Sequence, residues 1–567
     1  MMLKTSSNKI NPTARLLGFT IRKNIGLSAL ASIIMLIICP GYFVTQIIEL
    51  IDIRDRTYDA FNMINGFVLA VTVVAAIGVV FMNLINFSYL YSKKSSDVFH
   101  SVPLKRSGLL FARLFAGIIS VLIPVVIGYV SLMLIVLLMP GVVGELTPLF
   151  IGFGYTVTAM LFASTFSMMF IICAGTIFDW GVSFFGINLG ALAIGAIVFD
   201  FCSDYLRGFN SMNEADLFEY ISPLYYLFNG LGKFINGAVT VKSMLIYFSV
   251  CLILIAVFYI ISALLYKRRP AEKGGDSFAF KFVYTICSLI IGFCCGYGLG
   301  MIFAEAEFNP VFFIFGAIGS VLGCVIYGVI TNRGFKKVIR SIVLGAISFM
   351  VLSGLLISIK TDAFGYSTRV PEKSSIETAT VTLDNLDITL DDPQLILDLH
   401  KDICNQDYDD GYDKHIEFIY KLKNGTTMTR QFWIEGKLHN DELFKLFRSE
   451  ERLEAIEAQI DIAYEHFDVD YYLGDLEKSE YAYIKLDKAQ MREVFALYKE
   501  ELKNATKYDT NHYNEVTFYY NSKIEYGMDY TFFNLQISDE FPQTREKLNE
   551  LYEAFVLENE ETKEGID

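Results

Sequence analysis

The sequence is poor in charged residues and tryptophan, and it lacks the common catalytic and metal-binding motifs. Charged residues make up 19% of its 567 residues, and two Trp stand against 48 Phe. Soluble chains average roughly a quarter charged residues. The sequence has no Cys-x-x-Cys pair, no His-Glu-x-x-His and no Gly-x4-Gly-Lys-Ser/Thr loop. The composition excludes a chain of ordinary soluble domains, and the missing motifs predict no catalytic residue, no metal ligand, no resident cofactor and no nucleic-acid partner.

Charge is divided unequally about Lys360. Residues 1–360 carry 25 basic and 16 acidic side chains, whereas residues 361–567 carry 22 basic and 46 acidic ones. Eight of the nine Cys lie in or beside apolar runs of the first part, as small packing residues do, and only Cys404 lies in the acidic part. The sequence therefore predicts a membrane part joined to an acidic, water-soluble domain.

Nine apolar runs are long enough to cross a hydrocarbon core about 30 Å thick, which takes roughly 20 helical residues. They lie near 24–48, 64–88, 110–138, 148–176, 180–201, 242–266, 282–304, 311–331 and 341–360. The acidic residues Asp179, Asp200, Glu305 and Glu307 fall at the ends of runs. An ion-driven carrier usually keeps such groups at mid-membrane, so this mechanism is not expected.

The loops between the runs differ in basic residues, and this difference predicts the orientation. Nineteen Lys and Arg lie in or beside the N-terminal tail and the loops after runs two, six and eight, against five on the other side. Positive loops stay in the cytoplasm. We therefore expect a multi-pass protein of the cell membrane with a cytoplasmic N-terminus and an extracytoplasmic C-terminal domain. If 148–176 and 180–201 were one broken helix, joined through Phe178-Asp179-Trp180, the domain would lie inside.

Glycines spaced four residues apart mark close helix packing in three runs. The run 180–201 has Gly186 and Gly190, the run 282–304 has Gly292, Gly296 and Gly300, and the run 311–331 has Gly319 and Gly323. These stripes fit packing within the chain or against a second membrane subunit.

A short amphipathic stretch between two basic pairs follows the second run. Its candidate contact residues are Lys93, Lys94, Val98, Phe99, His100, Val102, Leu104, Lys105 and Arg106. One interpretation is an interfacial helix held on lipid headgroups by its lysines. The other is a docking helix for a cytoplasmic partner, with Phe99 as the largest apolar anchor.

Three segments together resemble the permease subunits of bacterial ABC-2-type transporters. Ser101-Val-Pro-Leu-Lys-Arg-Ser-Gly-Leu-Leu-Phe-Ala-Arg-Leu-Phe-Ala-Gly117 is similar to the family segment Ser-Leu-Pro-x-(Thr/Ser)-Arg, which joins the coupling helix to the third crossing. Val102 replaces the usual Leu, and Lys105 replaces a small polar residue. Ser222-Pro-Leu-Tyr-Tyr-Leu-Phe resembles the segment before the sixth crossing, and Tyr266-Lys-Arg-Arg-Pro-Ala-Glu-Lys-Gly-Gly resembles the exit from it.

The resemblance implies a six-helix permease unit over 1–270. Three further helices over 271–360, a polar linker over 361–374 and the acidic domain over 375–567 are similar to the extension found in a Firmicutes subgroup. The resemblance further implies a separate cytoplasmic ATPase that holds ATP and magnesium and docks near 93–106, and a second permease subunit, identical or related. The amphipathic stretch 12–23 would lie in the inner membrane interface beside lipid.

The acidic domain is predicted to be an α+β fold made of a tandem β-α-β-β-α repeat. The first unit has strands at 376–390, 415–422 and 427–434, with helices at 392–404 and from about 440. The second has strands at 480–486, 514–520 and 528–536, with helices at 488–504 and 543–556. Asn424-Gly425 between two alternating runs is typical of a hairpin turn.

No catalytic set stands out in this domain. His400, His415, His439, His466 and His512 are scattered, and we expect them to be structural or exposed. The pairs at 471–472 and 519–520 are Tyr-Tyr, which could bind a ligand but more often pack a sheet. The acidic run 407–413 lacks the Glu that a calcium loop carries at its twelfth position.

The predicted function is the permease subunit of an ABC transporter, expected to export a hydrophobic or amphipathic compound. The alternative is a non-transporting sensor whose outer domain binds a cell-envelope or peptide ligand. A membrane enzyme ranks third, for want of a catalytic set.

Overall fold

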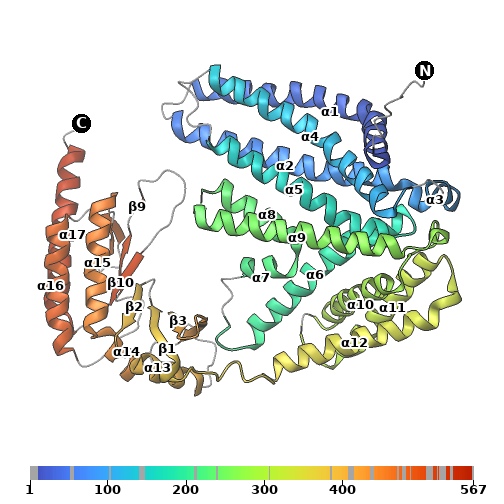
Figure 1. The fold of residues 1–567 in the computed structure, drawn as a ribbon. Coiled ribbons are helices and arrows are strands. Elements are labelled where there is room, and N and C mark those ends of the chain that lie inside the picture. Colours follow the sequence, from blue (N-terminus) through green and yellow to red (C-terminus); the bar gives the residue numbers. More distant parts are fainter. Residues whose placement is uncertain are drawn as a thin grey trace, which may run out of the picture. The chain divides into compact units, whose positions relative to one another are not determined.

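The computed structural model describes most of the chain. It covers residues 11–51, 56–100, 104–138, 147–209, 214–237, 240–305, 307–383, 386–405, 414–434, 440–468, 471–474, 481–484, 487–505, 515–519, 521–522, 532–536 and 540–564. Figure 1 follows the chain from α1 to α17. Contacts divide it into two compact units. We call residues 1–198 with 214–355 the membrane unit, and residues 199–213 with 356–567 the C-terminal unit.

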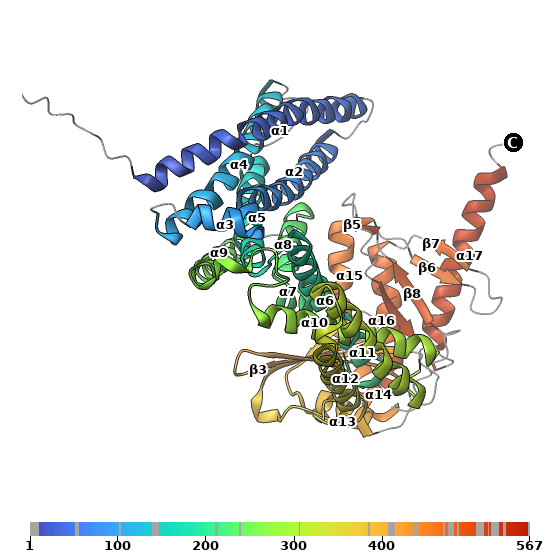
Figure 2. The ribbon, with the colours of Figure 1, turned by 90° about the vertical axis from the view of Figure 1, so that its right-hand side faces the viewer.

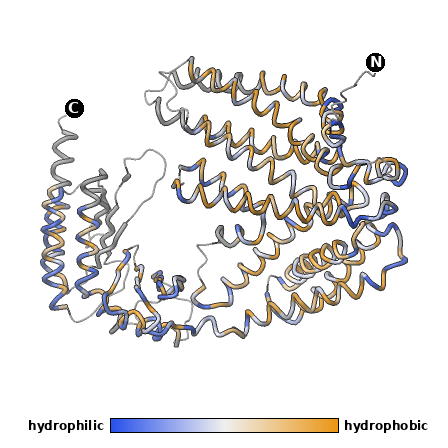
Figure 3. The backbone as a smooth tube through the Cα atoms, viewed as in Figure 1, coloured by the Kyte–Doolittle hydropathy of each residue, from blue (hydrophilic) through white to orange (hydrophobic). Residues whose placement is uncertain are grey.

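Nine of the described helices are long and apolar enough to cross a membrane, which confirms the predicted number for this part of the chain. They belong to α1 (Pro12–Ile51), α2 (Arg56–Phe87), α4 (Arg106–Leu138), α5 (Thr147–Cys173), α6 (Ile177–Tyr205), α9 (Val241–Arg268), α10 (Lys281–Phe303), α11 (Pro310–Asn332) and α12 (Val338–Lys360). Hydrophobic residues run along these helices (Figure 3). The shorter helices α7 (Glu214–Ile221) and α8 (Pro223–Ile235) lie between α6 and α9.

The first helix begins earlier than the sequence predicts. The first apolar run was expected from residue 24, with 12–23 as an interfacial stretch of its own. Instead α1 continues without a break from Pro12, and the candidate membrane span found among its described residues is Pro12–Ile37. Pro12 fits the first position of a helix, because the N–H it lacks would have no partner there.

Helices α5 and α6 are separate, so the alternative of one broken helix does not hold. The turn between them lies at 174–176, slightly before the predicted Phe178-Asp179-Trp180 turn. Thr176 explains the position. Its hydroxyl accepts a hydrogen bond from the backbone N–H of Asp179 at 3.2 Å and donates one to the Asp179 carboxylate at 2.5 Å. These bonds satisfy the first turn of α6.

Helix α5 forms the centre of the membrane unit and is the most buried of the nine. It packs against α2 and α9. Two polar pairs join α5 to α2: the hydroxyls of Thr72 and Thr156 lie 2.7 Å apart, and the Asn83 amide donates to the Ser164 hydroxyl at 3.0 Å. Such pairs favour helix association where no water competes.

The C-terminal unit contains two four-stranded antiparallel sheets. The first has the order β2-β1-β3-β4, and the second has the order β10-β8-β6-β7. The strands are β1 (Ile376–Leu383), β2 (Leu386–Leu390), β3 (Lys414–Leu422), β4 (Thr427–Ile434), β6 (Tyr471–Gly474), β7 (Tyr481–Ile484), β8 (Glu515–Tyr519) and β10 (Phe532–Gln536). A small pair, β5 (Phe467–Asp468) with β9 (Asn521–Ser522), stands apart from them. The helices are α13 (Gln394–Asn405), α14 (Asn440–Phe447), α15 (Glu450–His466), α16 (Lys488–Asn504) and α17 (Pro542–Glu564).

An α+β domain is therefore present, but the predicted β-α-β-β-α repeat is not confirmed in that form. The segment predicted as one strand over 376–390 is a hairpin, in which Val381 pairs with Ile388. A second hairpin, β6 with β7, also adds a strand that the prediction lacks. The two sheets share one pairing pattern. In the first sheet, β1 of the β1–β2 hairpin also pairs with β3, and β3 pairs with β4. In the second sheet, β6 of the β6–β7 hairpin also pairs with β8, and β8 pairs with β10.

The C-terminal unit also includes the end of α6 and the turn after it. The Arg207 guanidinium donates to the carbonyl of Ile403 at 3.2 Å, and the Gly208 carbonyl accepts from the N–H of Gln431 at 3.2 Å. Gly208 has φ +76°, and a Cβ there would lie 2.6 Å from the Phe432 ring. Residues 199–213 thus belong with a domain that the sequence places more than 150 residues later. The predicted boundaries at 270, 360 and 374 stay predictions.

Candidate functional site

The predicted docking residues lie on α3 (Lys93–His100) and on the chain just after it. Helix α3, labelled in Figures 1 and 2, directly follows the 3-10 turn η1 (Ser88–Tyr91) and packs against it. Lys93, Lys94 and Lys105 are exposed, and Leu104 and Arg106 are half-buried. Val98 is 64% exposed. Val102 lies outside the described residues, as does the side chain of His100.

Phe99 faces into the membrane unit, which differs from its predicted role as the exposed anchor. Its ring lies 4.7 Å from that of Tyr89, centre to centre, and the Arg113 guanidinium lies 4.2 Å from the Phe99 ring centre. The Tyr89 hydroxyl in turn lies 2.6 Å from that of Tyr266, and Arg113 also donates to the carbonyl of Asn86. These contacts fix α3 on α2, α4 and α9. Val98 is the apolar residue that α3 leaves exposed.

Two arginines bind the carbonyl groups at the ends of neighbouring helices. Arg106 donates to the carbonyl of Arg269 at 3.0 Å, just after α9 ends. Arg269 is 2% exposed and donates to the carbonyls of Ala174 at 2.8 Å, of Leu90 at 2.9 Å and of Ile172. The last carbonyls of a helix have no partner within it, and a cation there also interacts favourably with the helix dipole. Arg269 therefore joins α5, η1 and the exit of α9.

The loop after α9 pairs with the turn between α5 and α6. The N–H of Gly175 donates to the carbonyl of Ser277 at 3.0 Å, and the N–H of Gly275 donates to the carbonyl of Gly175 at 3.0 Å. A Cβ on Gly175 would lie 1.8 Å from the carbonyl oxygen of Asp276. Only glycine fits this approach of two backbones.

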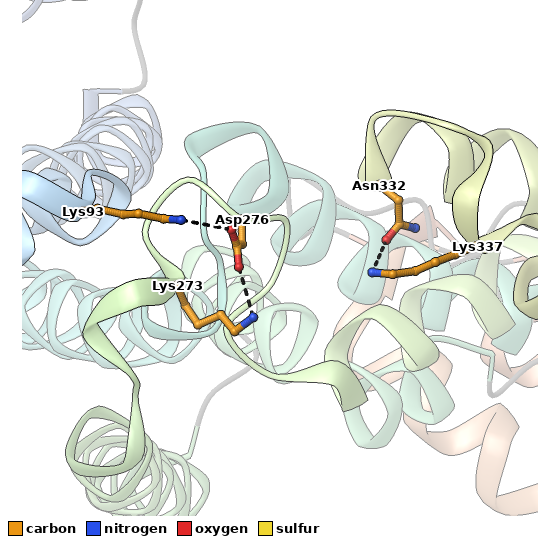
Figure 4. A network of polar contacts seen from close by, with 5 residues as sticks. All are labelled: Lys93, Lys273, Asp276, Asn332 and Lys337. Atoms are coloured by element: carbon orange, nitrogen blue, oxygen red, sulfur yellow. Dashed lines mark hydrogen bonds and ion pairs between the residues drawn. The ribbon is translucent and has the colours of Figure 1, made fainter.

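Asp276 connects this loop to α3 by ion pairs (Figure 4). Its carboxylate lies 3.0 Å from the Lys273 ammonium and 3.8 Å from that of Lys93. The hydrogen bond from Lys273 lowers the pKa of Asp276 below its usual value, because it favours the charged carboxylate. All three side chains are largely exposed, and such pairs contribute about 0–1 kcal/mol. The aromatic and arginine contacts therefore hold α3 more firmly than the ion pair does.

We call this assembly of η1, α3, the turn at 174–176 and the segment 266–278, which comprises the end of α9 and the loop after it, the junction. The sequence singles out Arg106 and the segment from Tyr266, but it does not connect them. Arg113 and Arg269 stand in the two segments that resemble the permease family and count among the basic residues of the loops, but no partner is predicted for either. The sequence feature that could have identified both residues is an arginine inside or directly beside an apolar run, because an arginine there needs hydrogen-bond or charge partners.

The predicted packing glycines lie in different surroundings. Gly292, Gly296 and Gly300 of α10 approach α11 closely, and Gly319 and Gly323 of α11 approach Cys295 of α10. A Cβ on Gly190 would lie 2.2 Å from Ile290. Gly186 has no atom within 4 Å of that position, so its face of α6 is open in the single chain.

The other candidates of the acidic part do not form a site within the described residues. His400 is buried, stacks on Phe418 and lies 3.0 Å from the Tyr420 hydroxyl. The His415 ring on β3 forms a hydrogen bond with the side chain of Gln431 on β4, while its partner in the strand register is Trp433. His439, His512 and the acidic run 407–413 lie outside the described residues, as do the side chains of His466 and of the Tyr pairs at 471–472 and 519–520. No metal-binding group of three or more His, Cys, Asp or Glu occurs in the described part, and the absence of a metal stays a prediction.

Comparisons with known proteins add no identification. No protein-family model matches the chain, and neither a curated protein nor a solved structure matches it. The function is therefore argued from the junction itself.

Proposed function

We propose that this chain is the membrane-spanning permease subunit of an ABC transporter that exports a hydrophobic or amphipathic compound. A separate ATPase subunit would dock on α3 and supply the energy, and a second permease subunit would complete the pathway. The observation that carries the proposal is the meeting of two segments about 150 residues apart, both of which resemble the permease family. Arg106 of the first segment binds the carbonyl of Arg269 in the second, and Tyr266 lies behind α3.

The construction of the junction supports a coupling role. A helix that transmits motion must be fixed on the helices that move, while one face remains available to its partner. Phe99 holds α3 against Tyr89 and Arg113, while Val98 is exposed between basic residues. An exposed apolar side chain on a short helix suits insertion into a groove of a partner. A displacement of α3 would reach α2, α4 and α9 through the residues that Phe99 and Arg269 contact.

The test is co-purification of the full-length chain with a candidate Walker-motif ATPase from the same organism. We expect Val98→Asp to release the ATPase or to uncouple its hydrolysis from substrate, since a carboxylate in an apolar groove costs at least tenfold in affinity. Ile339→Asp is the matched control, because Ile339 is 81% exposed and lies on the side predicted to be cytoplasmic. Equal retention of the ATPase by the wild type and both variants would contradict docking on α3.

The sensor alternative also has one observation in its favour. Residues 199–213 belong to the C-terminal unit, so a ligand-binding domain would act directly on α6, whose first turn adjoins the junction. A chain that keeps its cellular role when no ATPase associates with it would favour the sensor over the transporter.

A further inference from the structure

A basic pocket lies between the loop after α9 and the turn between α11 and α12. Its volume is about 410 Å³. Five cationic side chains line it, against the single carboxylate of Asp276. The cations are Lys273, Lys281, Arg333, Lys337 and Arg340.

The chain neutralises only part of this charge. Lys273 pairs with Asp276, and Lys337 donates to the Asn332 side-chain oxygen at 2.9 Å (Figure 4). Among the described residues, Lys281 and Arg333 form no ion pair. Asp179 also interacts electrostatically with Arg333. The five cations still outnumber these two carboxylates, so they repel one another, and an anion between them relieves that repulsion.

The inner wall of the pocket also offers hydrogen-bond donors. Thr331 is 4% exposed and lines the pocket, and its hydroxyl interacts with that of Tyr327. Helix α10 begins at Lys281, and no side chain caps its first N–H groups. Uncapped N–H groups at the start of a helix favour a negative charge. Arg333 has φ +51°, which ends α11 and turns the chain toward α12.

We propose that the basic pocket binds the phosphate group of an anionic lipid headgroup. A phosphate oxyanion matches several converging Lys and Arg side chains together with a hydroxyl donor. The lining residues lie in the loop after α9, in the first turn of α10, at the end of α11 and near the start of α12, which are ends of membrane-crossing helices, so we expect the pocket at the depth of headgroups. Basic pockets between crossing helices on the cytoplasmic side bind anionic lipids in other membrane proteins. The proposal does not depend on the transporter function.

The experiment uses the full chain purified in a neutral detergent. Phosphatidylglycerol and phosphatidylcholine are added separately, and lipid retention is measured by native mass spectrometry together with the thermal unfolding midpoint. The test variant carries Lys281→Gln and Arg333→Gln, both at exposed positions where the fold is not at risk. The matched control carries Lys267→Gln and Lys336→Gln, which removes the same charge from the same side, outside the pocket.

We expect the wild type to retain phosphatidylglycerol and to be stabilised by it, but not by phosphatidylcholine. Each removed cation should weaken retention roughly fivefold, and both together roughly thirtyfold. The control should stay within about threefold of the wild type. Equal losses in both double variants, or no difference between the two lipids, would overturn the proposal.

A third arm distinguishes the source of the phosphate. Inorganic phosphate and ADP, at millimolar concentration, should not displace the bound lipid. Displacement of the lipid by phosphate or ADP in the wild type, but not in the Lys281→Gln, Arg333→Gln variant, would show that the pocket binds a soluble phosphate. That result would overturn the lipid as the ligand of the pocket.

Discussion

The guanidinium of Arg113 stacks over the ring of Phe99, with 4.2 Å between its central carbon and the ring centre. Arg113 comes from α4 and Phe99 from α3, so this contact fixes the short helix on a membrane-crossing one. It also divides two tasks between neighbours. Phe99 holds α3 to the membrane unit, whereas the side chain of Val98 is 64% exposed.

This division predicts unequal losses of stability from two adjacent substitutions. Phe99→Ala should destabilise the membrane unit by about 1–3 kcal/mol, because it removes a ring contact, a cation–π contact and apolar burial. Val98→Ala should change stability by less than about 0.5 kcal/mol, since its side chain is exposed. Thermal unfolding of the detergent-solubilised chain measures both effects. Equal midpoints for the two variants would contradict the inward position of Phe99.

Arg269 should be among the most sensitive residues of the junction. Arg269→Gln leaves buried carbonyl groups of α5 and η1 without their charged donor, and we expect a loss of about 3 kcal/mol or more. Arg269→Lys should not restore it, because one ammonium cannot span the separate acceptors. Arg268→Gln is the adjacent control, since Arg268 is exposed. Equal unfolding midpoints for the Arg268 and Arg269 variants would count against this role of Arg269.

Gly175→Ala should prevent the junction from closing. The new Cβ would lie 1.8 Å from a backbone oxygen of Asp276, and the backbone cannot rotate away as a side chain can. We expect an aggregated or poorly folded product in size-exclusion chromatography. Gly181→Ala, also near the start of α6, has no atom within 4 Å of its Cβ position and should elute like the wild type. A monodisperse Gly175→Ala protein would contradict the backbone pairing.

His400 predicts a pH dependence for the first sheet of the C-terminal unit. Burial, with Arg430 nearby, lowers the pKa of His400 to about 4, so the folded domain keeps it neutral. The unfolded chain takes up a proton below about pH 6.5. Stability is therefore complete above pH 6.5 and is lost as the pH falls toward 4, by about 2 kcal/mol at pH 5.

Hydrogen exchange of the full-length chain at pH 7.5 and pH 5 measures this change in peptides from α13 and β3. Among the described residues, the phenol of Tyr420 and the guanidinium of Arg430 lie near His400, and neither titrates in this range. His400→Gln should remove most of the dependence. A wild type with equal protection at both pH values would contradict the buried neutral imidazole.

Orientation is tested by single cysteines in a chain whose nine natural cysteines are replaced by Ser. Asp391→Cys should react with an impermeant maleimide on intact cells, and Lys94→Cys should react only after permeabilisation. Both positions are exposed, whereas the natural Cys404 is half-buried and its thiol contacts the Ser367 carbonyl. The reverse pattern would invert the topology predicted from the basic loops.

The sequence predicts the crossing helices well because hydropathy alone determines them. It places the turn between α5 and α6 a few residues late, although Thr176 and Asp179 have the spacing of a helix cap. It misses the hairpin of β1 with β2, although Asp384-Asn385 are residue types that favour turns.

The direction of Phe99 could not be predicted from its own segment. Val98 and Phe99 are adjacent, and a helix of eight residues does not show by its pattern which of them is buried. The answer depends on Tyr89 and Arg113, which other helices contribute. Likewise, nothing in the local sequence connects Gly208 with Gln431, because that contact joins segments more than 200 residues apart.

The contact of Gly208 with Gln431 limits how this protein can be divided into fragments. A cut at the linker would separate the last two hundred residues from a loop on which they are built, and would expose an apolar edge on each piece. An exchange of the C-terminal domain between related chains would have to move two distant stretches of the gene together. Substitutions in one stretch are then expected to be tolerated only with matching changes in the other.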